Sequence, residues 1–454
     1  MRDSEPGRIF QQDCTTRTWP PQGGPSRLEW AVVIFAAVVQ QGAFLSIPLY
    51  FGNPSLHIRQ DQNDLNTIAV AGSLLSIMPF CISQRRSIGF LARKNALSIL
   101  FLLLVLGSAF WSIHPDLSLR RGMGYVVTLL VAAYLTIRFD VDNLMKVLSY
   151  SFAISALGSL LFIAVFPAAG IMNVVDLTGN WRGVFPHKTA LGLTMAVAVF
   201  VELFILSSHR ETRWRYALLA IFLSLVVMSH SATALIVSTI FLIGAFVFSL
   251  GRSSIFVGII ASLIVVTFGC IALWVFLSDP ELLFGALGKD LTLTGRTGLW
   301  KVVTSLIAER PFFGYGYRAM WVLNDADTIR IDRLVGGWGV GSSHNSFLEL
   351  TLQLGLFGMG LILLIVVIAF ARAFKCWLSV PGSLGFFSVI FFVGTLVAGQ
   401  TEEVLGQNQV IEWVVFNLLM FSCGAALANR QLPRRRSEMG SMANVRTATF
   451  PQCN

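Results

Sequence analysis

The chain has 454 residues, of which 55% are hydrophobic and only 13% are charged. Because a soluble globular domain carries about 25% charged residues, this composition excludes an ordinary soluble protein and indicates an integral membrane protein. The formal net charge of +9 does not indicate a nucleic-acid partner. The basic residues gather in short loops and in the tail at 434–436, as the positive-inside rule predicts for cytoplasmic segments.

Long apolar runs predict the fold class. A spanning helix needs about 20 apolar residues, whereas the strands of a membrane barrel alternate in polarity over about 10 residues. The runs in this chain are continuous, so we expect an all-α integral membrane protein with about twelve transmembrane helices. The expected spans are, in chain order, 29–50, 65–82, 95–111, 122–138, 146–168, 188–207, 214–229, 232–250, 255–278, 346–370, 384–400 and 409–428.

The basic residues also predict the topology. With the N-terminus inside, the cytoplasmic loops are rich in Arg and Lys, whereas the segment 279–345 balances seven basic against seven acidic residues and is expected outside. We expect no removable signal peptide. No cysteine lies in an outward loop, so no disulfide framework or Cys-based metal site is implied. The expected domains are a cytoplasmic tail over 1–28, transmembrane helices 1–9 over 29–278, a large periplasmic loop over 279–345, transmembrane helices 10–12 over 346–428 and a cytoplasmic tail over 429–454.

The first outward loops in chain order carry basic residues. Arg120 and Arg121 follow the third span, and Arg182, His187 and Lys188 precede the sixth. Positive charge is normally scarce in outward loops. A bound lipid phosphate would explain these residues, and interfacial snorkelling of their side chains is the alternative.

The long outward segment begins with a predicted amphipathic helix. Apolar residues recur at helical spacing between Thr294 and Arg310, and Pro311 ends the pattern. Arg296 falls in the first turn, where free N–H groups and the helix dipole attract anions and the guanidinium fork suits phosphate oxygens. This arrangement predicts a phosphate or pyrophosphate site. A solvated arginine on the helix surface is the alternative.

Two further motifs complete this segment. The glycines and aromatic residues of 312–317 lead to Arg318 and suit either a sugar or headgroup contact or an interfacial aromatic belt. Ser346 and Glu349 fit a capping box, so a span is expected to begin there. His344 and Asn345 would then lie at the outer membrane surface.

His344 is the strongest candidate for proton transfer. Histidine takes a proton from a hydroxyl near neutral pH, and Glu349 lies about a turn away, where it would orient or tune the imidazole. A polar capping residue is the alternative. Two smaller outward turns follow the same pattern, Ser229–Thr233 and Gln400–Glu403. The carboxylates of the second turn are either acid/base groups or solvated loop ends.

The outward loops therefore hold ionisable residues, while the span centres hold almost none. A proton-driven transporter should show such groups, or broken helices, at mid-membrane. The pattern instead predicts a site at the outer leaflet that handles a charged headgroup.

Taken together, these motifs resemble the O-antigen ligase/polymerase superfamily, especially its exopolysaccharide-polymerase (ExoQ-like) branch. The resemblance covers roughly residues 95–428. The residues that carry it are Trp111-Ser112-x-x-Pro115-x-x-Ser118-Leu119-Arg120-Arg121, Arg182-Gly183-x-x-x-His187-Lys188, Ser229-x-Ser231-x-Thr233, Gly295-Arg296-Thr297-x-x-Trp300, Arg310-Pro311-x-x-Gly314-x-Gly316 and His344-Asn345-Ser346-Phe347-Leu348-Glu349 followed by Gly355-x-x-Gly358.

The resemblance implies a GT-C-like membrane protein of the bacterial inner membrane with a helical periplasmic cap. It implies glycosyl transfer without a metal or cofactor, from a glycan on undecaprenyl pyrophosphate to an acceptor glycan at the periplasmic leaflet. Arg296 and Arg182 would hold the pyrophosphate, with support from Arg318 and Lys188, and His344 would activate the acceptor. The chain departs from many relatives at Ala232, where they carry arginine.

We therefore expect a polymerase that joins lipid-linked repeat units into exopolysaccharide or O-antigen, working beside a flippase and a chain-length regulator. One alternative is a ligase that transfers a finished glycan to lipid A-core. A lipid-glycan transporter or flippase is an alternative of another class, and a non-catalytic assembly partner is a third.

Overall fold

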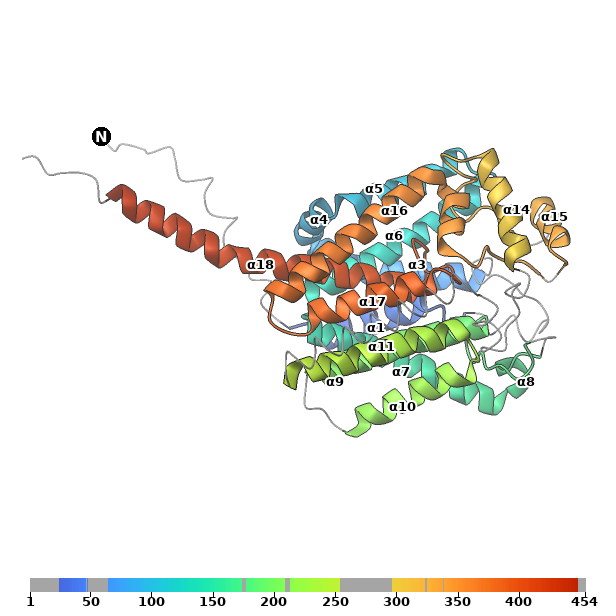
Figure 1. The fold of residues 1–454 in the computed structure, drawn as a ribbon, viewed down its shortest axis with the longest axis horizontal. Coiled ribbons are helices and arrows are strands. Elements are labelled where there is room, and N and C mark those ends of the chain that lie inside the picture. The colour runs from blue at the N-terminus through green and yellow to red at the C-terminus, as the bar shows by residue number, and fades with distance from the viewer. Residues whose placement is uncertain are drawn as a thin grey trace, which may run out of the picture.

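The computed structural model describes residues 24–45, 47, 64–173, 177–208, 213–253, 296–322, 325–337 and 339–447. These residues are largely helical, and the extended pairing among them is an isolated bridge between Ile171 and Trp181. Most helices run side by side along one direction, with α14 and α15 at one end of the bundle and the end of α18 projecting from the other (Figure 1). The expected all-helical fold class is confirmed for this part of the chain.

The helices have the following bounds. They are α1 Arg27–Gln40, α3 Asp64–Ser83, α4 Arg85–Lys94, α5 Ala96–Gly107, the 3-10 helix η2 Ser108–Phe110, α6 Pro115–Arg138, α7 Val141–Val165, α8 Pro167–Gly170, α9 Lys188–Ser208, α10 Arg213–Met228, α11 Ala232–Ser253, α14 Arg296–Glu309, α15 Ala326–Leu334, α16 Ser346–Ser379, α17 Leu384–Ala398 and α18 Ile411–Thr447.

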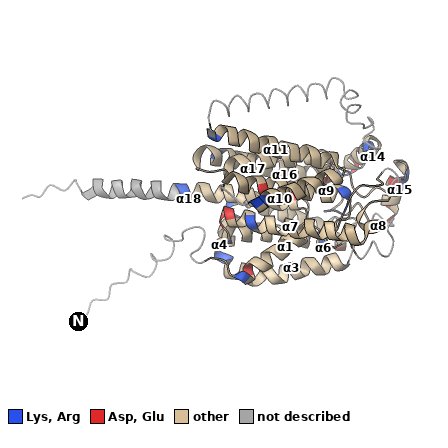
Figure 2. Ribbon diagram, turned by 90° about the horizontal axis from the view of Figure 1, so that it is seen from below, with Lys and Arg blue, Asp and Glu red and all other residues tan. Residues whose placement is uncertain are grey.

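Among the described residues, six helices are long and apolar enough to cross a membrane, or seven if α4 and α5–η2, which are bent by 95°, form one span. A helix lies at each predicted span except 255–278, which falls outside the described residues. Charged residues are coloured mostly toward the two ends of the bundle (Figure 2). The chain is therefore a multi-pass membrane protein, and the full count of twelve spans stays a prediction.

Among the helix boundaries that differ from the predicted ones, two have clear local reasons. α1 ends at Gln40 rather than at residue 50, because Gly42 and Phe44 both adopt a left-handed backbone with φ of 69°, which ends an α-helix. α6 begins at Pro115 rather than at residue 122, because proline is pre-organised for the first helical position. The start of α6 therefore carries Arg120 and Arg121 as helical residues.

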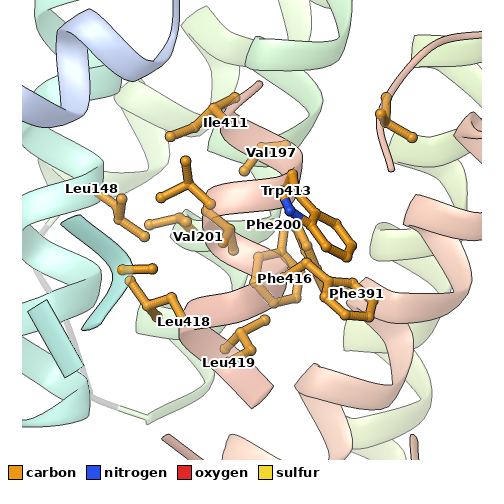
Figure 3. Packing of buried hydrophobic residues seen from close by; sticks show 14 of the residues in the cluster. Leu148, Val197, Phe200, Val201, Phe391, Ile411, Trp413, Phe416, Leu418 and Leu419 are labelled. Atoms are coloured by element: carbon orange, nitrogen blue, oxygen red, sulfur yellow. The ribbon is translucent and has the colours of Figure 1, made fainter. Parts of the chain in front are cut away.

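The core of the bundle forms around α9, which packs against α7, α10, α11 and α18. Phe200 of α9 lies against Phe391 of α17, with ring centroids 4.8 Å apart. Trp413 and Phe416 of α18 stack on the same side (Figure 3). Inside a membrane such packing stabilises helix association mainly through close van der Waals contact, so this core fixes the helices that hold the outer loops.

One ion pair lies inside this core. Glu202 of α9 accepts from Arg215 of α10 at 3.2 Å, and Ser149 of α7 also donates to the Glu202 carboxylate. All three side chains are buried. An isolated charge at such a place is strongly unfavourable, so Glu202 and Arg215 need each other. Together with Ser149 they link α7, α9 and α10.

The cap, which we define as residues 296–340, has a small core of its own. Leu299 and Val303 of α14 pack with Trp321 and with Ile331 of α15. Leu352 of α16 belongs to the same cluster. The cap is therefore packed directly on the N-terminal part of α16.

A break in α16 joins the cap to the bundle. Gly355 has non-helical dihedrals, φ 64° and ψ −166°. On the N-terminal side of the break, the carbonyls of Leu352 and Gln353 accept from the amides of Tyr315 and Gly316, both at 2.9 Å.

On the C-terminal side of the break, the backbone of α16 donates hydrogen bonds instead of accepting them. The amides of Leu356 and Phe357 donate to the carbonyls of Pro311 and Phe312, at 2.8 and 3.3 Å. The cap segment thus satisfies backbone groups that the break leaves unpaired. We call this reciprocal exchange the splice.

Candidate active site

Arg296 is the first described residue of α14, the helix that the sequence predicts between Thr294 and Arg310. Its Nη1 donates to the carbonyl of Thr401 at 2.8 Å, and its Nη2 donates to Oε1 of Glu402 at 3.2 Å. Trp300, one turn along α14, donates to the carbonyl of Ser343 at 2.9 Å. The start of α14 is therefore fixed both to the loop before α18 and to the segment that carries His344.

His344 lies immediately before α16, at the predicted place. Its backbone has a left-handed φ of 49°, a strained state for a non-glycine residue that is more frequent at functional sites. Its Nδ1 lies 3.5 Å from Oε2 of Glu402. Asn345 caps α16 by accepting from the amides of Phe347 and Leu348, so Asn345, and not the predicted Ser346, is the capping residue.

Glu349 contacts groups other than those expected. It is fully buried and accepts from Nε1 of Trp321 at 2.9 Å, from the amide of Ser343 at 2.9 Å and from Nε2 of Gln353 at 2.7 Å. These contacts hold the backbone beside His344 and tie it to the cap. The carboxylate beside the imidazole is that of Glu402.

Glu402 is the residue at which the site comes together. One carboxylate oxygen faces Arg296 and the other faces His344, and the side chain is 15% exposed. Burial by itself raises the pKa of this carboxyl, but the facing imidazole of His344 and the charges of His344, Arg296 and His187 outweigh it and hold the pKa below its ordinary value. The carboxylate is thus ionised at neutral pH.

From sequence, Glu402 is only one of two carboxylates in a turn predicted to face outward. The signal that marks it is a pair of acidic residues in a loop beside a membrane span. Nothing local in that turn shows which basic groups face it, because Arg296 lies 106 positions earlier in the chain.

Other outward segments reach the same loop. The hydroxyls of Thr233 and Thr401 lie 2.7 Å apart, and the side-chain amide of Asn345 donates to the carbonyl of Gln400 at 3.0 Å. Lys188 donates to the carbonyl of His230 at 3.2 Å. The turn at 229–233 and the start of α9 therefore belong to the surroundings of Glu402, and in the described part of the chain no group of three His, Cys, Asp or Glu residues is arranged to hold a metal ion.

Arg182 lies against α8. Its Nε donates to the carbonyl of Ala169 at 2.8 Å, and its backbone amide donates to the carbonyl of Gly170 at 3.0 Å. The side chain is buried. These contacts fix Arg182 in the outer wall of the bundle, and its pairing with Arg296 at one pyrophosphate stays a prediction.

The remaining arginines gather at the other end of the loop that joins α17 to α18. Arg121 is buried and donates to the carbonyl of Arg318, while Arg120 is half-buried on the same helix. Arg318 donates to Oδ1 of Asn408 at 3.1 Å and has a left-handed φ of 53°. The structure therefore places Arg296 at Glu402, Arg318 at Asn408 at the other end of this loop, and Arg182 against α8.

Comparison with known proteins gives two matches. Residues 217–363 match the family model described as O-antigen ligase, a range that contains both Arg296 and His344. The chain is also 31% identical over 308 residues to the exopolysaccharide production protein ExoQ of Rhizobium meliloti (strain 1021). The aligned region covers 63% of this chain and 67% of that protein.

Proposed function

The chain belongs to the O-antigen ligase/polymerase superfamily and is ExoQ-like, and from this premise we propose that it is a polysaccharide polymerase. Its substrates are oligosaccharide repeats on undecaprenyl pyrophosphate, joined into exopolysaccharide or O-antigen. The proposal rests mainly on one observation: Arg296 and His344 both contact the Glu402 carboxylate. An anion-binding side chain therefore lies beside a side chain that can accept a proton.

The proposal includes a topology. Twelve spans would place both termini in the cytoplasm and the cap in the periplasm of a bacterial inner membrane, with about 20 apolar residues for each span. The site would then open at the outer leaflet, where lipid-linked glycans and a flippase and chain-length regulator would meet the enzyme.

In the proposed reaction, an acceptor sugar hydroxyl attacks C1 of the donor glycan. The new C1–O bond forms as the bond between C1 and the pyrophosphate oxygen breaks, and undecaprenyl pyrophosphate leaves with the electron pair. His344 takes the hydroxyl proton. Direct attack inverts the anomeric centre.

Negative charge grows on the leaving pyrophosphate, and groups already aimed at that position lower the barrier. Arg296 supplies a guanidinium at the N-terminus of α14, where the helix dipole also favours an anion. Arg182 and Lys188 are proposed to contact the same pyrophosphate. No metal is assigned to this role.

A ligase is the second candidate, because the matching family model bears that description. A ligase would use the same donor chemistry and differ in its acceptor, a finished glycan moving to lipid A-core. A transporter of lipid-linked glycans is an alternative of another class, and it predicts that the purified protein forms no product.

The test is complementation of a bacterium that lacks its own copy of the gene. His344→Ala and Arg296→Ala are compared with Arg330→Ala, which removes an exposed arginine of α15, and membrane levels of each variant are measured. We expect the first two to lose long polymer and keep single repeats, and the third to keep normal polymer. Full-length polymer left unattached to its acceptor would indicate the ligase, and normal polymer in all three would refute the catalytic roles.

A further inference from the structure

We propose that Glu402 is a positioning residue that holds the His344 imidazole with its proton on Nδ1, so that Nε2 accepts the proton of the attacking hydroxyl. This inference rests on the proposed function and adds a residue to it. The two oxygens of the Glu402 carboxylate face different side chains. Oε1 lies 3.2 Å from Arg296, and Oε2 lies 3.5 Å from His344.

The backbone around Glu402 fixes the carboxylate in place. The carbonyl of Thr401 accepts from Arg296 at 2.8 Å, and the carbonyl of Glu402 itself accepts from the hydroxyl of Ser346 at 2.7 Å. The same hydroxyl accepts from the amide of Val404 at 2.8 Å. Ser346 is two residues from His344, so the loop and the imidazole are attached to one short piece of α16.

A carboxylate beside one nitrogen of histidine determines the tautomer. The charged oxygen favours a proton on the nitrogen that faces it, and the lone pair then lies on the other nitrogen. In the serine-protease triad an aspartate holds a histidine in this way and stabilises the imidazolium that forms during proton transfer. The 3.5 Å separation is long for a hydrogen bond, and catalytic hydrogen bonds often tighten when substrate binds.

The charges around Glu402 agree with this role. Arg296 approaches from α14, His344 from the start of α16 and His187 from the start of α9. Glu412, in the first turn of α18, is a nearby group of the same sign. Three groups that carry or accept positive charge thus face one partly buried carboxylate, so it can stay ionised and accept the Nδ1 proton as a hydrogen bond.

Glu402 and Glu349 have separable effects. Glu349 holds the backbone of Ser343 and the side chain of Trp321, so its loss should disturb the cap. Glu402 lies against the imidazole, so its loss should change the tautomer of His344 while the cap stays folded. This difference makes the inference testable without an activity measurement.

The first measurement is the tautomer itself. Protein labelled with ¹⁵N in histidine is reconstituted in lipid bilayers, and the His344 signals are assigned in solid-state NMR spectra by their loss in His344→Gln. We expect the Nδ1–H tautomer in the native protein and in Glu309→Gln, a control carboxyl that accepts from Tyr315 at the far end of α14. We expect a mixture of tautomers in Glu402→Gln.

The second measurement is polymer formation in the complemented strain. Glu402→Gln should lower it by about 100-fold or more, the usual contribution of a group acting in proton transfer. Glu402→Asp should restore part of it, because a carboxylate is retained. An Nε2–H tautomer in the native protein, or an unchanged tautomer in a folded Glu402→Gln variant, would overturn the inference. Normal polymer in His344→Ala would instead refute the proposed function.

Discussion

Replacing Gly355 by alanine tests whether the cap is joined to α16 through the splice. Gly355 combines φ 64° with ψ −166°, a region of backbone space that is essentially restricted to glycine. A Cβ added there would overlap the carbonyl group of Phe312 and the amide of Phe313. The alanine variant must therefore distort the helix break, displace the cap segment, or both.

The expected loss of stability is the sum of backbone strain at position 355 and weakened hydrogen bonds to the cap. The backbone strain costs about 1–3 kcal/mol. Displacement of Phe312 weakens the two hydrogen bonds whose acceptors are Pro311 and Phe312, at about 1 kcal/mol each. We therefore expect a loss of about 3–5 kcal/mol, a large share of the total of about 5–15 kcal/mol that is typical of proteins.

The assay is equilibrium unfolding in mixed micelles, followed by tryptophan fluorescence as SDS is added. Gly360→Ala is the matched control, because Gly360 lies in the same helix and a Cβ there would meet nothing within 4 Å. Alanine in a helix interior is favoured over glycine by about 0.5–1 kcal/mol, so the control should be unchanged or slightly more stable. Equal stability of the two variants would refute the assignment of Gly355 as the point that joins the cap.

Three other predictions concern stability. Glu202→Ala should cost about 3–5 kcal/mol in the same assay, because it leaves Arg215 buried without its carboxylate; replacing both residues by leucine should recover most of that loss. Trp321→Phe should cost about 1–3 kcal/mol and speed proteolysis within the cap, because Glu349 loses a buried donor. The pKa of Glu402 is lower in the folded protein than its ordinary 4.5, so its ionised form stabilises the fold above that pH, and this contribution is lost as the pH falls below it. The difference in stability between native protein and Glu402→Gln should accordingly hold down to about pH 4.5 and shrink as the pH falls further, and a difference that stays constant down to about pH 3 would contradict the ionised assignment.

Local features of the site were predictable because local sequence determines them. The apolar spacing after Arg296 and the stop at Pro311 predict α14, and the structure has that helix at Arg296–Glu309. His344 was predicted immediately before a membrane helix, and α16 begins at Ser346. In both cases the signal is a helix boundary, which a few neighbouring residues set.

Features that depend on distant contacts were not predictable in the same way. Gly355 stands in an apolar run that predicts an unbroken helix, whereas the structure breaks the helix where the segment 311–316 bonds to it. Glu402 meets residues that are remote in sequence. Glu349 is near His344 in the chain and was therefore predicted to orient it, whereas the carboxylate that lies beside the imidazole is that of Glu402.

The loop between α17 and α18 has a consequence for biosynthesis. Chains leave the ribosome from the N-terminus and fold in that order, so α14 and α16 are made before this loop. Until this loop is made, Arg296 and His344 lack the carboxylate that both of them face in the folded protein. A chain arrested before Glu402 would hold both residues of the proposed site without the carboxylate that both face, so we expect translation of the last loop before α18 to complete the proposed site.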